Sequence, residues 1–117
     1  MILVDTCVWI DHFRAIKKKL SDAIAEGLVL VHPFVIEEIA CGSVSRRGEV
    51  LALLGSLQKA PAVTHHEVIR FIEGHNLFGA GLGSVDIHLL ASAKLAGAKV
   101  WSTDKALMAA ARRLGLV

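Results

Sequence analysis

The stretch Leu28-Val29-Leu30-Val31-His32-Pro33 contributes most to the predicted fold. Its four consecutive apolar residues favour a strand buried on both faces, because a half-exposed strand would alternate apolar and polar residues. Pro33 suits the first turn of a helix, where the N–H that proline lacks has no partner to lose. The stretch therefore predicts a buried strand that leads directly into a helix, and this helix continues to about Gly42.

The same alternation of strand and helix extends to both sides. Toward the N-terminus, Ile2-Leu3-Val4 predicts a strand that stops at Asp5, and Thr6 is expected to cap the segment that follows. Toward the C-terminus, Lys99-Val100-Trp101 predicts another strand. The other expected elements are a short strand at Ala62-Val63-Thr64, helices at about 17–26, 46–57, 65–73, 84–96 (capped by Ser84) and 104–113, and a glycine-rich loop at 74–83.

Strands separated by helices predict an α/β fold with right-handed crossovers. We expect a three-layer sandwich, in which a central, mostly parallel sheet carries helices on both faces. A length of 117 residues with no linker-like segment predicts a single domain spanning 1–117.

The composition limits the class of protein. With 54% hydrophobic and 21% charged residues the chain is expected to fold, and a net charge of +2 neither requires nor excludes a nucleic-acid partner. No apolar run approaches the ~20 residues that span a bilayer. The two cysteines form no C-x-x-C pair. We therefore expect no membrane segment and a reduced, cytoplasmic protein.

Acidic residues follow the predicted strands, at the edge of a parallel sheet where ligand sites usually form. Asp5 ends the first strand, Asp104 lies just beyond the last one, and Asp86 lies in the first turn of a predicted helix. Glu38 lies about one turn into the helix after the second strand. Each acid also has an ordinary explanation: aspartates stabilise the first turn of a helix, and Glu38, beside Glu37, can be a solvated charge.

Taken together, the four acids indicate a metal site. Carboxylates that converge in one cleft repel each other, and Mg²⁺ or Mn²⁺ offsets this repulsion because hard cations take carboxylate and water oxygens. Such ions activate water and stabilise charge on a phosphodiester. The pattern therefore predicts hydrolysis of a phosphodiester by metal-activated water.

Around these acids, four blocks of sequence resemble those of VapC toxins, which are PIN-domain ribonucleases. The blocks are Val4–Asp11 (VDTCVWID), Glu38–Gly42 (EIACG), Val85–Ser92 (VDIHLLAS) and Trp101–Lys105 (WSTDK). They occur in the family's order and cover essentially the whole chain. The resemblance implies a PIN-like three-layer sandwich and an Mg²⁺- or Mn²⁺-dependent endoribonuclease. It also implies the toxin of a toxin–antitoxin pair, a VapB-type antitoxin as partner, and a homodimer.

The resemblance also assigns site residues. The family's catalytic and metal-binding acids fall on Asp5, Glu38, Asp86 and Asp104. Glu38 is preferred over Glu37 because the family's acid precedes a glycine, here Gly42, by four residues.

Three neighbouring side chains, Thr6, Cys7 and Ser102, are expected to support the acids. Cys7 departs from the family, which usually has a hydroxyl residue at that position. Because a thiol is the weaker hydrogen-bonding group, we expect weaker support for the site but no loss of metal binding.

Basic residues fall in small groups that either contact RNA phosphates or form solvated helix faces. The groups are Arg14 with Lys17-Lys18-Lys19, Arg46 with Arg47, and Arg112 with Arg113. Lys105, next to Asp104, is the best single candidate for an RNA contact, and Arg14, Arg46 and Arg47 are further candidates.

Three other functions are alternatives to the nuclease. A phospho-accepting receiver domain has an acidic pair at the end of its first strand and an aspartate after its third. In this chain Asp5 stands between Val4 and Thr6, and the strand predicted at 62–64 leads to His65. A phosphatase of the haloacid dehalogenase type has a second aspartate two residues after the first, where a cysteine stands here. A catalytically idle binding module remains the other alternative.

Overall fold

A parallel sheet of four short strands forms the centre of the computed structural model, which describes residues 1–117. The strands are β1 (Ile2–Val4), β2 (Val29–Val31), β3 (Gln58–Lys59) and β4 (Lys99–Trp101). Their order is β3-β2-β1-β4, and all three pairings are parallel. In β1, Leu3 stands opposite Leu30 of β2 and Val100 of β4.

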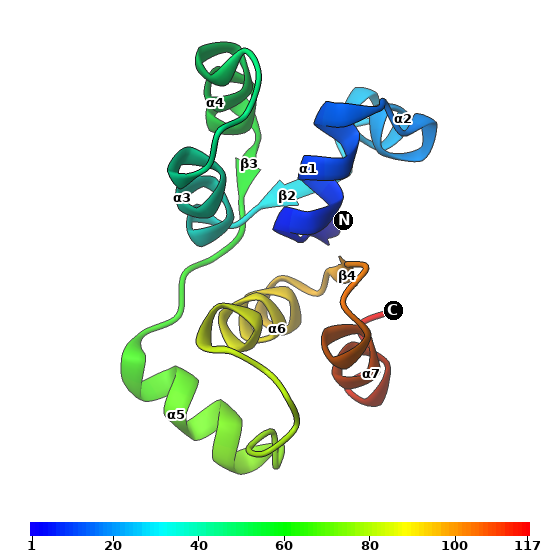
Figure 1. Ribbon diagram of the computed structural model, residues 1–117. Coiled ribbons are helices and arrows are strands. Elements are labelled where there is room, and N and C mark those ends of the chain that lie inside the picture. The colour runs from blue at the N-terminus through cyan, green and yellow to red at the C-terminus, as the bar shows by residue number, and fades with distance from the viewer.

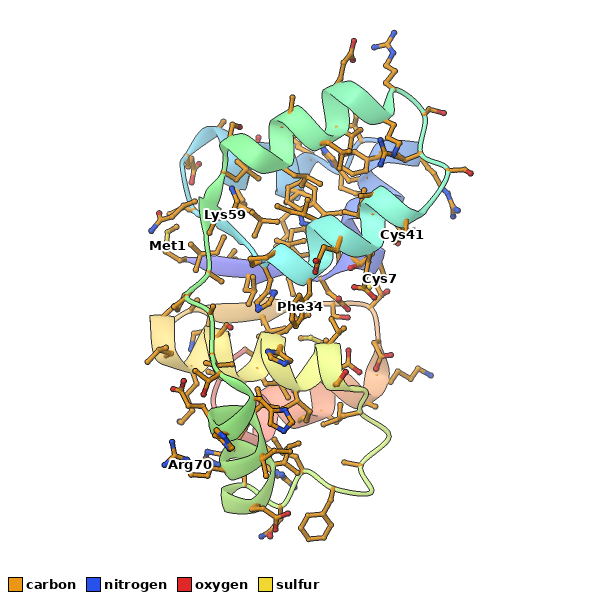
Figure 2. The ribbon with its side chains drawn as sticks, turned by 90° about the vertical axis from the view of Figure 1, so that its left-hand side faces the viewer. Met1, Cys7, Phe34, Cys41, Lys59 and Arg70 are labelled. Atoms are coloured by element: carbon orange, nitrogen blue, oxygen red, sulfur yellow. The ribbon has the colours of Figure 1, made fainter.

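Seven helices cover the sheet and complete three layers (Figures 1 and 2). On one side lie α1 (Thr6–Arg14), α2 (Lys18–Ala25), α3 (Pro33–Cys41) and α4 (Arg47–Ser56); on the other lie α6 (Ser84–Ala96) and α7 (Lys105–Arg113), with α5 (His65–Gly74) packed outside α6. The predicted α/β sandwich is therefore confirmed. None of the seven helices combines the length and the apolar character needed to span a membrane.

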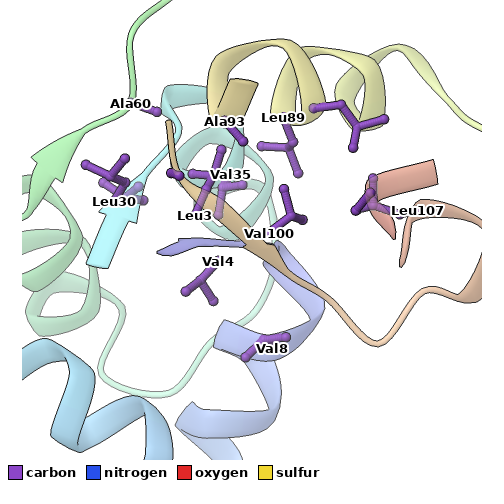
Figure 3. Close-up of a cluster of buried hydrophobic side chains, with 14 of the residues drawn as sticks. Leu3, Val4, Val8, Leu30, Val35, Ala60, Leu89, Ala93, Val100 and Leu107 are labelled. Atoms are coloured by element: carbon purple, nitrogen blue, oxygen red, sulfur yellow. The ribbon is translucent and has the colours of Figure 1, made fainter. Parts of the chain in front are cut away.

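The core lies between the sheet and the two helical layers. Figure 3 shows Leu89 and Ala93 pointing from α6 toward the sheet, near Val100 of β4. The side chains of Leu3 and Leu89 are fully buried. Because the core holds the strands in register, it also fixes where their carboxyl ends lie, and the acidic residues follow those ends.

The prediction of a strand at Ala62-Val63-Thr64 is wrong. The edge strand is β3, Gln58–Lys59, whose two residues are exposed. Polar residues suit an exposed sheet edge, and the Lys59 ammonium donates to the carbonyls of Leu54, Gly55 and Leu57 at the end of α4. Thr64 is not available for a strand because its hydroxyl caps α5 by accepting a hydrogen bond from Glu67 N.

Two predicted helix caps are displaced by one residue. Asp5, not Thr6, caps α1, since its carboxylate accepts the Thr6 N–H at 2.8 Å. At α6 the cap is Gly83 rather than Ser84, and Asp86 accepts the Gly83 N–H at 3.0 Å. Both corrections assign a capping hydrogen bond to a predicted site acid.

We expect Leu89→Ala to lower the free energy of unfolding by about 2–5 kcal/mol, because it leaves a cavity between α6 and the sheet. The matched control is Leu95→Ala on the same helix, where the leucine is 62% exposed, and it should cost less than about 1 kcal/mol. Urea denaturation of both variants measures the difference. Equal losses would contradict the assignment of Leu89 to the core.

Candidate active site

The carboxyl ends of β1 and β4 meet at one edge of the sheet. The ladder between them continues one residue past β1, because Asp5 N donates to the Trp101 carbonyl at 2.9 Å. This bond places Asp5 beside Ser102, whose hydroxyl donates to Asp5 Oδ2 at 2.7 Å. Both side chains are buried, with 9% and 8% exposed. In Figure 2 this edge is marked by Cys7, at the end of β1 opposite Met1.

Asp104 is tied to the same edge through Ser102. The Ser102 hydroxyl accepts the Asp104 N–H at 3.0 Å while it donates to Asp5. Asp104 Oδ1 in turn caps α7 by accepting Leu107 N at 2.9 Å. A single buried hydroxyl therefore links the two aspartates that follow neighbouring strands.

Glu38 reaches the edge from α3. Its Oε1 accepts the Thr6 hydroxyl at 2.6 Å, and the Thr6 N–H donates to Asp5. Thr6 therefore connects the acid on α3 to the acid after β1. Glu37, the neighbouring acid, makes no such contact and lines a different groove, beside Phe34.

All four acids expected at the site line one pocket of about 430 Å³, called here the acid pocket. Its lining residues are Asp5, Thr6, Cys7, Ile10, Glu38, Val85, Asp86, Thr103 and Asp104. They come from four segments that are far apart in the sequence. A larger pocket between α5 and α6 has no such group of acids, since Glu67 is its one carboxylate.

The acids in this pocket influence each other electrostatically. Partial burial raises the pKa of Asp86 above its ordinary value of 3.8, and the Gly83 N–H opposes this shift. The negative charges of Asp5, Asp104 and Glu38 raise the pKa of Asp86 further. The acids accept hydrogen bonds from three helix N-termini and from the Thr6 hydroxyl. Repulsion among the carboxylates remains in spite of these bonds, and a bound cation would relieve it.

The carboxylates of the acid pocket fit an Mg²⁺ or Mn²⁺ ion that keeps several of its waters better than an ion bound by side chains alone. No set of three or more His, Cys, Asp or Glu side chains is arranged to hold a metal ion. One oxygen each of Glu38, Asp86 and Asp104 accepts a hydrogen bond, and the second oxygen of each accepts none. Mg²⁺ typically keeps several waters and binds through one or two carboxylates, so these free oxygens suit it.

Cys7, one of the residues expected to support the acids, lies against Asp5 and Ser102. Its sulfur lies 3.5 Å from both Asp5 Oδ2 and Ser102 Oγ, and it accepts the Thr103 N–H at 3.4 Å. These contacts are long beside the 2.7 Å bond from Ser102 to Asp5. Ser102 thus holds Asp5 more firmly than Cys7 does.

The basic residues named as RNA contacts lie outside the acid pocket. Lys105 is exposed at the start of α7 and does not line the pocket. Arg14 lines a groove that shares Ile10 with it. Arg47 donates to the Ala40 carbonyl at 3.2 and 3.0 Å and so braces the turn between α3 and α4. The exposed Arg46 guanidinium lies 3.8 Å from the Glu49 carboxylate.

The histidines near this edge have structural partners. His32 caps α3 by accepting the Phe34 N–H at 3.0 Å, and burial together with nearby His88 lowers the pKa of His32 to about 4. His12 accepts the Lys17 N–H at 3.0 Å, and burial lowers the pKa of His12. None of them lines the acid pocket.

Three lining residues were missed from sequence: Ile10, Val85 and Thr103. Val85 directly precedes Asp86, and Thr103 directly precedes Asp104. Their positions in the sequence could therefore have predicted that they line the pocket. Ile10 lies in the turn of α1 that follows Thr6, but its orientation depends on how α1 packs on α3.

The comparisons with known proteins agree on one family. The model of the PIN domain family matches residues 2–113. Ribonuclease VapC32 of Mycobacterium tuberculosis, from strains CDC 1551 / Oshkosh and H37Rv, is 47% identical over 117 residues, which cover 99% of this chain and 94% of that protein. The crystal structure of PAE2754 from Pyrobaculum aerophilum superposes with a TM-score of 0.65 at 18% identity. That match covers 95% of this chain and 79% of the other, and it shows a shared fold. The chain belongs to the PIN-domain family and, within it, to the VapC group.

Proposed function

We propose that this chain is an Mg²⁺- or Mn²⁺-dependent endoribonuclease and the toxin of a toxin–antitoxin pair. A relative that is 47% identical over nearly its whole length is a ribonuclease, which supports RNA as the substrate. The observation that carries the proposal is the acid pocket, where four carboxylates from distant segments converge at one edge of the sheet.

The acids Asp5, Glu38, Asp86 and Asp104 would hold the metal, directly or through water. A bound Mg²⁺ or Mn²⁺ supplies a water of lowered pKa and positive charge opposite the phosphodiester. Ser102 and Thr6 keep Asp5 and Glu38 oriented by the hydrogen bonds described above. Ile10 and Val85 are the aliphatic side chains that line the pocket beside the acids.

The alternative functions have less support. A receiver domain needs a phospho-accepting aspartate after its third strand, and β3 is followed by Ala60 and Pro61. An idle binding module gives no reason for four carboxylates to share a pocket in which they raise the pKa of Asp86.

We also propose the other properties that the VapC resemblance implies. An unrestrained nuclease would damage the RNA of its own cell, so a partner that covers the acid pocket follows from the chemistry, and a VapB-type antitoxin fits this role. We further propose a cytoplasmic homodimer whose protomer is a single domain spanning residues 1–117.

The first test of the function compares two adjacent glutamates on α3. Glu38→Gln should slow metal-dependent cleavage of RNA on the order of 10³-fold, equivalent to about 4 kcal/mol of transition-state stabilisation. Glu37→Gln removes the same charge outside the acid pocket and should stay within about threefold of wild type. Cleavage of total RNA with Mg²⁺ or with chelator is the measurement. Equal rates for the two variants, or cleavage that persists in chelator, would refute the proposed site.

The second prediction concerns Asp86 and pH. Because folding raises the pKa of Asp86 above 3.8, its ionisation destabilises the folded state. This cost is absent below the unfolded pKa and complete above the folded one. In chelator, Asp86→Asn should therefore raise Tm at about pH 7 and leave it unchanged at about pH 3. Asn keeps a side-chain oxygen for the Gly83 N–H.

With millimolar Mg²⁺ the order of Tm at about pH 7 should reverse, because only wild type gains the stabilisation of full metal binding. Glu37→Gln, melted in parallel, should show no reversal. If Asp86→Asn were less stable than wild type in chelator, the carboxylate would be stabilising the metal-free fold, and the account of repulsion in the pocket would be wrong.

The third prediction separates Cys7 from Ser102. Cys7→Ala should keep metal binding and cost less than about 1 kcal/mol of stability, since the sulfur contacts are long. Ser102→Ala should cost about 1.5–3 kcal/mol, because its hydroxyl serves a buried carboxylate. Calorimetric titration with Mn²⁺ and urea denaturation measure both effects. Loss of metal binding in Cys7→Ala would show that the thiol is essential to the site.

A further inference from the structure

A second, basic pocket adjoins the acid pocket. It has a volume of about 390 Å³ and is called here the lysine pocket; its lining residues are Val8, Asp11, Ile16, Lys17, Lys18, Lys19, Trp101 and Thr103. Thr103 lines both pockets. Lys17 is the N-cap of α2, and Lys18 and Lys19 are the first two residues of that helix. Trp101 ends β4, next to the buried Ser102.

Helix α1 separates the two pockets. Cys7 and Ile10 line the acid pocket, whereas Val8 and Asp11, each one residue further along, line the lysine pocket. Successive residues of an α-helix are about 100° apart around its axis, so the pockets occupy adjoining sides of α1. An extended ligand that passes from the acid pocket over Thr103 therefore enters the lysine pocket.

Two of the three lysines of the lysine pocket are available to a ligand. The ammonium groups of Lys17 and Lys19 make no hydrogen bond or ion pair, and Lys19 Nζ lies 4.7 Å from the centre of the Trp101 ring. Lys18 pairs with Asp22 at 2.8 Å. The Thr103 hydroxyl likewise has no partner within the chain, so it can donate to an incoming oxygen.

The charges around the acid pocket favour a path for an RNA strand that leads into the lysine pocket. Four carboxylates repel phosphates, so an RNA strand needs cations close to the cleaved bond. The groove beside Phe34, which shares Glu38 and Val85 with the acid pocket, carries two glutamates and no cation. The groove that shares Ile10 with the acid pocket carries one cation, Arg14. The lysine pocket carries three cations and one carboxylate, Asp11.

We propose that the lysine pocket binds the phosphodiester backbone of the RNA strand, with Lys17 and Lys19 contacting phosphates a few nucleotides from the bond in the acid pocket. The choice of RNA as ligand rests on the proposed function. The contact is to the backbone, so it positions the strand without reading its sequence.

The test measures binding separately from cleavage. A labelled single-stranded RNA of about 20 nucleotides is titrated in Mg²⁺ at several salt concentrations against full-length protein carrying Asp86→Asn, which removes one of the proposed metal-holding acids. The same background then receives Lys17→Gln with Lys19→Gln. The matched control receives Arg70→Gln with Lys94→Gln, which removes two positive charges from the pocket between α5 and α6.

The lysine pair should weaken RNA binding roughly 10- to 30-fold near 0.1 M salt and reduce the slope of log affinity against log salt by about 1.4, or about 0.7 for each phosphate contact. The control should change the affinity less than threefold. Unlabelled RNA should also change the tryptophan emission. This change reports Trp101, because Trp9 is completely buried.

Unchanged affinity and slope in the lysine variant, or an equal loss in the control, would overturn the lysine pocket as an RNA site. Poly-glutamate is titrated in parallel. If the lysine pair controls its binding but not that of RNA, the pocket takes an acidic protein segment and the proposal is wrong. Cleavage by wild type is assayed separately. Lysine-dependent binding without cleavage would refute the nuclease and leave the lysine pocket standing.

Discussion

The hydrogen bond from the Ser102 hydroxyl to Asp5 joins the ends of the two strands on which the site depends. It is buried, it spans 2.7 Å, and it continues the pairing of β1 with β4 beyond the last residue of each strand. The same hydroxyl accepts the Asp104 N–H. Strand register, set by the core, therefore determines the position of two of the four acids, and a slip of one residue would separate them.

Helix caps give the acids a structural role in addition to the proposed catalytic one. Asp5, Asp86 and Asp104 each accept a backbone N–H at the start of a helix. Helix N-termini carry partial positive charge and so offset part of the repulsion among the carboxylates. Burial is the main cause of the raised pKa of Asp86, and the negative charges of Asp5, Asp104 and Glu38 raise it further. The carboxylates therefore destabilise the metal-free fold, and a bound divalent cation would remove this cost.

The parts of the fold that sequence predicted are those where local and tertiary preferences agree. The strands β1, β2 and β4 have apolar stretches, and α3 begins at Pro33 as expected. The edge strand β3 was not predicted because Gln58 and Lys59 have no strand-like pattern. Pairing with β2 and the bonds of Lys59 to the end of α4 hold it in place.

For the site, sequence predicted all four acids and the edge of the sheet where they gather, but not the hydrogen bonds that orient them. Composition does not distinguish Glu38 from Glu37; the resemblance favoured Glu38, and the packing of α3 against α1 turns it toward Thr6. Sequence named Lys17–Lys19 as one of several basic groups but could not place it beside the acid pocket, because Thr103 and Trp101, which also line the lysine pocket, come from the far end of the chain.

We infer that the four carboxylates of the acid pocket form a divalent-cation site. An anomalous difference map of crystals soaked in Mn²⁺ tests it most directly. We expect a manganese peak in the acid pocket, held directly or through water by Asp5, Glu38, Asp86 and Asp104. A map with these side chains well ordered and no peak among them, or with the only peak elsewhere on the chain, would contradict it.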